Sequence, residues 1–281
     1  MSGWVFVNGE MVERESARVS AFDRSFLYGD GLFETVRAYG GAPFLLGEHL
    51  DRMSGSAEAL GIGMPDRGGI SAAIAQLIKR NGLADAYVRI TLSRGTHTGA
   101  LAPGEPLEPT LVIDVRPLHA YPAELYERGA ALAVSSLRHD SASPLRRHKT
   151  TGYVLSILAK REAKERGADE ALLLDGDGQV CEGATSNVFC VRGGTLLTPP
   201  LDLNILPGVT RATAIRLAGD HGMPIEDAGF TLDELCAADE VFLTNSLMEI
   251  LPVRRVDESE LRPAPGLATR SLAAGYRRLT G

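Results

Sequence analysis

Two-residue turn signals recur along this chain between short runs of apolar residues, and they limit what the chain can fold into. Asn8-Gly9 separates Trp4–Val7 from Met11–Glu13, which is the pattern of a type I′ β-hairpin. In the second half, Asp175-Gly176-Asp177-Gly178 and Arg192-Gly193-Gly194 separate further pairs of short apolar runs. Both halves of the chain are therefore expected to contain strands joined by hairpins.

Segments with helical periodicity alternate with these strands, so the expected fold class is α+β. In the first half, helices are expected at about 47–60 and 70–80, and strands at 33–39, 43–46, 87–93 and 110–115. In the second half, helices are expected from Thr150 or Thr151 to about 167, and at about 207–222 and 266–279. The strands expected there are 130–136, 172–174, 179–181, 187–191, 195–198, 240–244 and 250–254.

A proline-bounded segment, Pro117–Pro122, interrupts the pattern and is interpreted as part of a linker. We expect a small α+β domain at 1–116, a linker at 117–129 and a larger domain at 130–281. The length of 281 residues is comfortable for two domains.

Composition excludes several classes of protein. The net charge of −7 argues against non-specific binding of nucleic acid, which needs a basic surface. No apolar run approaches the roughly 20 residues that cross a bilayer, and Met1-Ser2-Gly3-Trp4 does not open a secretory signal. Three cysteines without a C-x-x-C spacing indicate reduced thiols in a cytoplasmic protein.

Common catalytic motifs are missing from the sequence. It contains no G-x-x-x-x-G-K-[ST], no G-x-G-x-x-G after a strand and no G-x-S-x-G. Its six histidines form no H-E-x-x-H and no close set, so no metal site is expected.

Three polar segments remain as candidate chemistry. Lys149 lies in the basic run Arg146–Thr151, where neighbouring cations favour a neutral amine that can form an imine with a carbonyl. Leu206–Arg211 opens a helix whose first N–H groups could hold a phosphate. Glu182–Asn187 clusters a carboxylate with small polar residues at a chain reversal. Taken singly, each also fits an ordinary structure: a solvated basic turn, a capped helix and a polar turn.

Together and in this order, these segments resemble the class IV aminotransferase family of pyridoxal 5′-phosphate (PLP) enzymes, also called fold type IV. Arg24–Glu34 (RSFLYGDGLFE) is similar to the family's N-terminal motif, and Glu48–Arg52 (EHLDR) to its phosphate-arginine motif. The resemblance covers nearly the whole chain. It implies a small N-terminal α+β domain, a larger domain with a barrel-like sheet, PLP between them, and a homodimer.

The resemblance also assigns roles residue by residue. Lys149 matches the lysine that holds PLP as a Schiff base and moves the substrate proton. Glu182 matches the acid that faces the pyridine nitrogen, and Asn187 is expected to order the turn after it. The phosphate ligands are expected to be Arg52, Val209, Thr210 and Ser246.

The family includes branched-chain and D-amino-acid aminotransferases and aminodeoxychorismate lyases. Arg94–Ala100 has no arginine after Gly95, which disfavours the D-amino-acid enzymes, although His97 fits them. Tyr87-Val88-Arg89 resembles a branched-chain motif, whereas Thr185-Ser186-Asn187 and Thr244–Glu249 depart from the branched-chain pattern.

The runs Thr244–Met248 (TNSLM), Leu251-Pro252-Val253 and Lys149–Tyr153 (KTTGY) are most similar to the lyases. The resemblance thus favours a lyase that makes 4-aminobenzoate and pyruvate from 4-amino-4-deoxychorismate, a step towards folate. Its first alternative is an aminotransferase for branched-chain or related amino acids with 2-oxoglutarate, and a third is a non-catalytic PLP carrier. The expected substrate contacts are Phe33, Arg89, His97 and Asn245.

Overall fold

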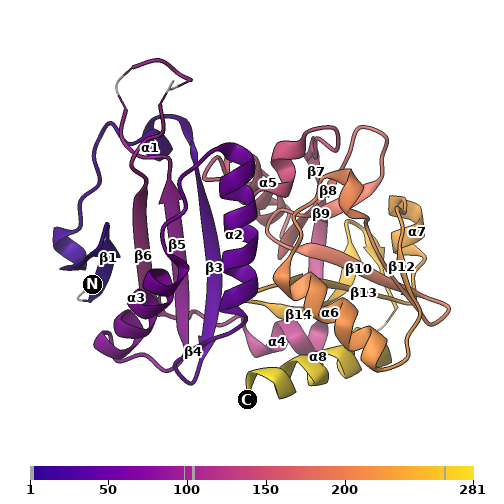
Figure 1. Cartoon of the computed structure of the whole chain (residues 1–281). Helices are drawn as coiled ribbons and strands as arrows, with labels where there is room; N and C mark the ends of the chain where they lie inside the picture. Colours follow the sequence, from indigo (N-terminus) through magenta and orange to yellow (C-terminus); the bar gives the residue numbers. More distant parts are fainter. Residues whose placement is uncertain (1–2, 98, 103–104, 263) are drawn as a thin grey trace. The chain divides into compact units, whose positions relative to one another are not determined.

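The computed structural model describes residues 3–97, 99–102, 105–262 and 264–281, and the chain divides into two compact units (Figure 1). Unit 1 contains the chain as far as His119 together with His148–Tyr153. Unit 2 contains Ala120–Arg147 and Val154–Gly281. Lys149 therefore belongs to the first unit, although it lies in the second half of the sequence.

Unit 1 is built on a six-stranded antiparallel sheet with the order β2-β1-β6-β5-β3-β4. Asn8 and Gly9 both have positive φ, at 46° and 98°, which confirms the hairpin expected there. The strands are β1 (Trp4–Val7), β2 (Glu10–Glu13), β3 (Gly31–Tyr39), β4 (Ala42–Pro43), β5 (Ala86–Ser93) and β6 (Thr110–Pro117).

Two helices, α2 (Leu46–Leu60) and α3 (Arg67–Arg80), pack on the sheet of unit 1 (Figure 1). Their apolar residues recur at helical spacing and form one buried core with the alternate residues of the strands. Asp66 caps α3 by accepting a hydrogen bond from Gly69 N at 2.6 Å. A short helix that the sequence did not indicate, α1 (Arg24–Tyr28), is capped by Asp23 in the same way.

Two expectations about local structure were wrong. The strand expected at 43–46 ends at Pro43, because Leu45 adopts a left-handed conformation and turns the chain into α2. The helix expected from Thr150 or Thr151 begins only at Val154. The preceding residues pair instead with β3: Phe33 N donates to Lys149 O, and Thr151 N donates to Gly31 O, each at 2.9 Å.

Unit 2 contains a nine-stranded mixed sheet with the order β12-β11-β10-β13-β14-β7-β8-β9, and β15 pairs with β14. Its two parts curl towards each other, since β9 contacts β10 across the order. This confirms the α+β class and the barrel-like sheet. The strands are β7 (Ala130–Arg138), β8 (Glu170–Leu174), β9 (Val180–Gly183), β10 (Asn187–Arg192), β11 (Thr195–Thr198), β12 (Ile225–Asp227), β13 (Glu240–Asn245), β14 (Glu249–Val256) and β15 (Ser259–Glu260).

The helices of unit 2 include one in the segment expected to be linker, where Pro122 opens α4 (Ala123–Arg128). The others are α5 (Val154–Glu165), α6 (Val209–Asp220), α7 (Leu232–Cys236) and α8 (Leu267–Thr280). Across the described ranges, every helix falls short of the length and apolarity that crossing a bilayer requires.

Candidate active site

In unit 1, Lys149 lies against two aromatic rings, that of Phe33 on β3 and that of Tyr153 at the end of the segment 148–153. Its Nζ is 4.5 Å from the centre of the Phe33 ring and 5.4 Å from that of Tyr153, and the two rings meet edge to face. The guanidinium of Arg89 lies 3.9 Å from the same Phe33 ring. Phe33 thus brings the lysine amine and the Arg89 guanidinium to one buried ring.

A second set of side chains in unit 1 holds Arg52. Glu34 is 1% exposed and accepts hydrogen bonds from Arg52 Nε at 2.8 Å and Arg52 Nη2 at 2.6 Å. His49 Nδ1 lies 2.8 Å from Glu34 Oε2. Burial opposes ionisation of Glu34, but the charge of Arg52 and the hydrogen bonds from His49 and Arg52 outweigh it and lower the pKa of Glu34 to about 2. A carboxylate only accepts, so His49 donates from Nδ1.

In unit 2, β9 places Glu182 in a buried position, where its Oε2 accepts a hydrogen bond from Leu206 N at 3.1 Å. Arg146 Nη2 and His139 Nδ1 each lie 3.6 Å from Glu182 Oε1. Burial lowers the pKa of His139 and the charge of Arg146 adds to that effect, whereas the hydrogen bond between His139 Nε2 and Leu203 O, at 2.9 Å, opposes it. His139 is therefore neutral with its proton on Nε2, and Arg146 is the cation that faces the carboxylate.

Helix α6 begins at Val209, and no side chain caps it. Its first backbone N–H groups therefore donate to no capping side chain. Asn187, the first residue of β10, donates from Nδ2 to Leu206 O at 2.9 Å. A Cβ on Gly208 would lie 2.1 Å from Asn187 Oδ1, so only glycine fits. Glu182 and Asn187 thus both bond the backbone of Leu206, and they hold in place the segment that leads into α6.

The turn after β13 contains the other two predicted residues of unit 2. Asn245 Oδ1 accepts hydrogen bonds from Leu247 N and Met248 N, both at 2.8 Å, and Asn245 Nδ2 donates to Thr185 O at 3.1 Å. Ser246 lies within this turn and is half-buried. The Asn245 side chain therefore holds the turn together and joins it to residue 185.

Within each unit, the structure brings together most of the residues named from the sequence. Unit 1 groups Lys149 with Phe33 and Arg89, and holds Arg52 separately through Glu34. Unit 2 joins Glu182 and Asn187 to the start of α6, where Val209 and Thr210 lie. His97 lies on the loop after β5, and its backbone N–H donates to Phe22 O at 3.3 Å.

Sequence reasoning missed five side chains that position these groups: Glu34, His49, Tyr153, Arg146 and His139. Two signals were present. Glu34 is a charged residue on the face of β3 that otherwise carries the apolar Leu32, Val36 and Ala38. His49 and Arg52 are spaced i, i+3 on one face of α2. The contacts of Arg146 and His139 with Glu182 span more than 30 residues and leave no local pattern.

The donor groups fit the chemical groups of PLP. A buried carboxylate suits a pyridinium N–H, and an uncapped helix start suits a phosphate. Among the described residues, His139 Nδ1, Arg146 Nε and Ser186 Oγ are buried polar atoms without a hydrogen-bond partner. No group of three or more potential metal ligands occurs in the described part of the chain.

Comparison with known proteins gives consistent results. The sequence pattern of the family described as "Amino-transferase class IV" matches residues 31–256. A protein of Methanocaldococcus jannaschii named as a branched-chain-amino-acid aminotransferase is 38% identical, over 90% of this chain and 88% of its own length. The aminodeoxychorismate lyase of Bacillus subtilis is 35% identical, over 98% of this chain and 94% of its own.

Among solved structures, the branched-chain amino acid aminotransferase of Escherichia coli is similar with a TM-score of 0.94 and 31% identity, covering 100% of this chain and 96% of its own. The match of the family pattern spans most of the sequence, and the relatives span nearly all of it. The chain therefore belongs to the class IV aminotransferases, a family of PLP-dependent enzymes.

Proposed function

We propose that Lys149 and Arg52 of unit 1 act on the same PLP molecule as Glu182, Asn187, Val209, Thr210 and Ser246 of unit 2. The contacts of Glu182 support this assignment, because a buried carboxylate that faces the cation Arg146 can accept the N–H of a pyridinium ring. The uncapped start of α6 and the arginine fixed by Glu34 supply the charge that a phosphate needs.

Bound PLP supplies a carbonyl carbon for the substrate amine and a ring that withdraws electrons from the adjacent carbon. Lys149 holds the cofactor at rest and then takes the proton from the carbon that bears the substrate nitrogen. Phe33 and Tyr153 keep the amine of Lys149 in an aromatic setting, which limits the positions it can reach. Arg89 is the residue proposed to bind a substrate carboxylate, and His97 and Asn245 are proposed to lie near the substrate.

We further propose that the reaction is that of an aminodeoxychorismate lyase, which converts 4-amino-4-deoxychorismate to 4-aminobenzoate and pyruvate. One observation carries this choice. The two segments that depart from the branched-chain pattern, 185–187 and 244–249, are joined by the bond from Asn245 Nδ2 to Thr185 O. Asn245 Oδ1 also accepts hydrogen bonds from the backbone N–H groups of Leu247 and Met248. The Asn245 side chain therefore links the two segments that differ from the branched-chain pattern into one structural unit.

In this reaction, Lys149 removes the proton from the ring carbon that bears the amine. The bond between the ring and the enolpyruvyl oxygen then breaks, and its electron pair leaves with the oxygen. The ring becomes aromatic, and the enol takes up a proton to give pyruvate. Arg89, whose guanidinium lies on the same aromatic ring as Lys149, is suited to hold a substrate carboxylate during these steps.

The test compares two substrates on the purified holoenzyme. With 4-amino-4-deoxychorismate we expect equal amounts of 4-aminobenzoate and pyruvate, and with leucine and 2-oxoglutarate we expect no glutamate above background. The Lys149→Ala variant should form neither product. Formation of glutamate without 4-aminobenzoate would show that the lyase assignment is wrong.

A second candidate is an aminotransferase for branched-chain or related amino acids. Tyr87-Val88-Arg89 on β5 favours it, since Arg89 beside Lys149 could also bind the carboxylate of 2-oxoglutarate. The relatives named as branched-chain enzymes support it as well. The leucine arm of the same experiment decides between the two candidates.

We also propose a cytoplasmic homodimer. Cys181, Cys190 and Cys236 form no disulfides, which suits a reducing compartment. Burial raises the pKa of the Cys181 and Cys190 thiols to about 12, so they remain unreactive. The proposed contact with the second copy is a group of exposed apolar side chains that includes Phe22, Phe26 on α1 and Leu101.

A further inference from the structure

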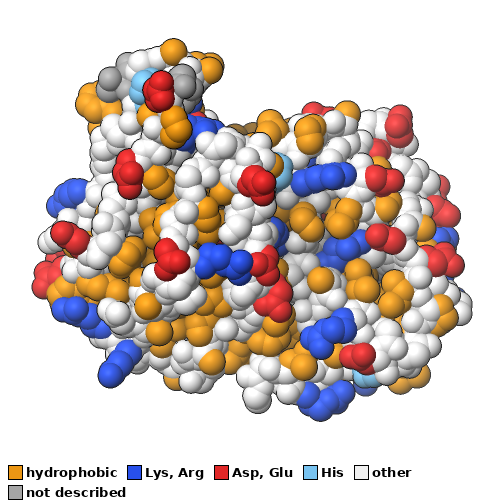
Figure 2. Space-filling view, in the orientation of Figure 1, with side chains coloured by type: hydrophobic (Ala, Val, Ile, Leu, Met, Phe, Trp, Pro, Cys, Tyr) orange, Lys and Arg blue, Asp and Glu red, His pale blue; other side chains and the backbone are white. Residues whose placement is uncertain are grey.

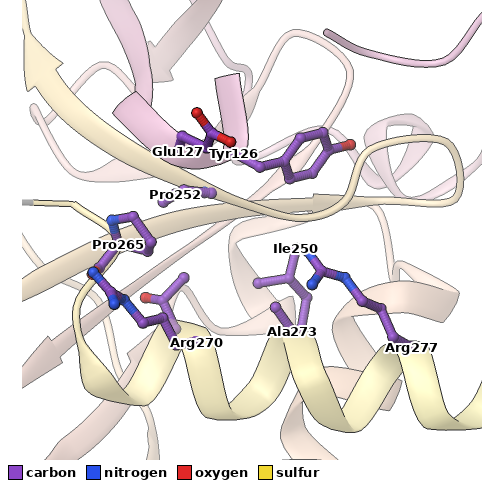
Figure 3. A pocket seen from close by; sticks show the side chains of 9 residues that line it. Tyr126, Glu127, Ile250, Pro252, Pro265, Arg270, Ala273 and Arg277 are labelled. Atoms are coloured by element: carbon purple, nitrogen blue, oxygen red, sulfur yellow. The ribbon is translucent and has the colours of Figure 1, made fainter. Parts of the chain in front are cut away.

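Unit 2 contains a pocket of about 380 Å³ between α4, β14 and α8 (Figure 3). This volume lies within the range of roughly 300–1,000 Å³ that is typical of small-molecule sites. None of the residues that line the pocket belongs to the proposed PLP site. The lining residues that the argument uses are Tyr126, Ile250, Pro252, Arg270, Ala273 and Arg277.

The floor of the pocket consists of buried apolar side chains of β14. Ile250 is 1% exposed, and Pro252 is buried beside it in β14. Ala273, on the facing side of α8, leaves room because its side chain is a single methyl group. Thr269 also lines the pocket, but its hydroxyl already donates to Glu240 Oε2 at 2.7 Å. An apolar group would therefore gain from binding here.

The rim of the pocket carries two cations on one face of α8. Arg270, Ala273 and Arg277 follow the spacing i, i+3, i+7, so both guanidinium groups flank the same opening. Arg270 Nε donates to Pro265 O at 2.9 Å, which fixes this side chain, and in the described ranges neither arginine forms an ion pair. In Figure 3, Arg277 points towards Ile250, whereas the carboxylate of Glu127 points away from α8.

We propose that this pocket binds a small organic anion, in which a carboxylate is carried by an apolar chain or ring. The apolar part packs on Ile250, Pro252 and Ala273, and the carboxylate accepts hydrogen bonds from Arg277 and Arg270. A planar guanidinium matches a carboxylate in geometry as well as in charge. The pocket is a binding site in its own right, and its existence does not depend on the proposed reaction.

The pocket is also connected to the turn after β13. Tyr126 forms part of its wall and donates from its hydroxyl to Met248 O at 3.1 Å, while Met248 N donates to Asn245 Oδ1. Ser246, a proposed phosphate ligand, lies in the same turn. A bound anion that shifts Tyr126 is therefore expected to change the rate at which PLP dissociates, a consequence that rests on the proposed function.

The experiment uses 8-anilinonaphthalene-1-sulfonate, an aromatic sulfonate that fluoresces in apolar sites, titrated into the holoenzyme. The Arg277→Gln variant should weaken binding about fivefold, the effect of losing about 1 kcal/mol at an exposed charge. Arg278→Gln is the matched control, because Arg278 is exposed on the same helix and does not line the pocket. Ala273→Trp should abolish binding by filling the space.

Competition separates the charge requirement from simple apolar binding. Octanoate should displace the probe, and octylamine, which has the same chain with a positive charge, should not. Equal displacement by both ligands, or equal affinities of the Arg277→Gln and Arg278→Gln variants, would overturn the proposal. Thermal unfolding of each variant checks that it is folded, and the octanoate and octylamine comparison needs only the wild type.

PLP release with and without octanoate, in wild type and Tyr126→Phe, then tests the coupling separately from the binding.

Discussion

Glu34 is a charged side chain of unit 1 that is buried and bonds both Arg52 and His49. Its function in the proposed site is to position Arg52, whose side chain is 11% exposed. A neutral amide at residue 34 can keep one of the two bonds to Arg52 but not the charge. Arg52 then lies opposite a dipole and samples more positions.

We expect the Glu34→Gln variant to lose about 3 kcal/mol of unfolding free energy, which is the lower end for a broken buried pair because the Arg52 side chain is partly exposed. PLP should bind roughly tenfold more weakly, which corresponds to about 1.4 kcal/mol. Asp51→Asn is the control, since Asp51 pairs with Arg67 on the exposed face of α2 and should change stability by less than about 1 kcal/mol. Urea unfolding and equilibrium dialysis of PLP measure both quantities. Equal effects of the two variants would contradict the role assigned to Glu34.

The same carboxylate predicts a dependence of stability on pH. The pKa of Glu34 is lowered from 4.5 to about 2 in the folded protein, so its contribution is fully present above pH 4.5 and is lost as the pH falls through 2. The linkage amounts to about 3 kcal/mol. Urea unfolding at several pH values between 6 and 2.5 should show the difference between wild type and Glu34→Gln shrinking with acidity. A constant difference across that range would mean that Glu34 does not titrate in this way.

At the scale of elements, local patterns predicted most helices and hairpins because their signals lie within a few residues. The Asn8-Gly9 hairpin and the helices at 46–60 and 67–80 are examples. The segment 148–153 could not be predicted in the same way. Its conformation depends on pairing with β3, more than 100 residues earlier, and this pairing outweighs the helix-capping tendency of Thr150 and Thr151.

Of the candidate site, the sequence supplied residues through a family resemblance rather than through geometry. The structure adds the side chains that orient them, such as Tyr153 against Phe33 and Arg146 beside Glu182. It also shows that the Asn245 side chain accepts a hydrogen bond from Leu247 N within its turn, which residue type alone could not indicate. Contacts between distant segments decide these details.

The start of α6 offers a test at the scale of one element. Gly208→Ala places a methyl group against Asn187 Oδ1, and we expect it to displace the bond from Asn187 to Leu206 O and to weaken PLP binding about tenfold. Gly219→Ala in the same helix is the control, because its Cβ meets only Ile225 Cδ1, at 3.9 Å. That control should gain about 0.5–1 kcal/mol of stability from helix propensity and keep its PLP affinity. Matching PLP affinities in the two variants would show that Gly208 is not required.

At the scale of the whole molecule, the chain passes between its two units three times, after His119, Arg147 and Tyr153. The third segment of this path carries Lys149. Its backbone is fixed by β3, and His148 Nδ1 lies 2.9 Å from Ser56 Oγ of α2. The lysine proposed to react thus belongs to unit 1, whereas the acid and the helix start proposed to bind the same cofactor belong to unit 2. A substitution that unfolds either unit is therefore expected to abolish PLP binding.

A patch of exposed apolar side chains on unit 1 remains to be explained by this architecture. It contains Phe22 (57% exposed), Phe26 (77%) and Leu101 (70%), and Arg24 Nη2 donates to Leu101 O at 2.7 Å, which holds the loop beside α1. Figure 2 shows hydrophobic side chains on the projecting loop of unit 1 at the upper left. Contiguous exposed apolar surface of this kind marks an interface, and the proposed partner is a second copy of the chain.

We expect the wild type to sediment at about twice the chain mass of 30.0 kDa. The Phe26→Glu, Leu101→Glu double variant should sediment as a monomer, because two buried carboxylates in each copy would face an apolar interface. Leu267→Glu is the control: Leu267 is 86% exposed in unit 2 and lies outside the patch, so the dimer should persist. Analytical ultracentrifugation at several concentrations measures the dissociation constant of each protein. A monomeric wild type, or a double variant that dimerises as well as the control, would assign the patch another role.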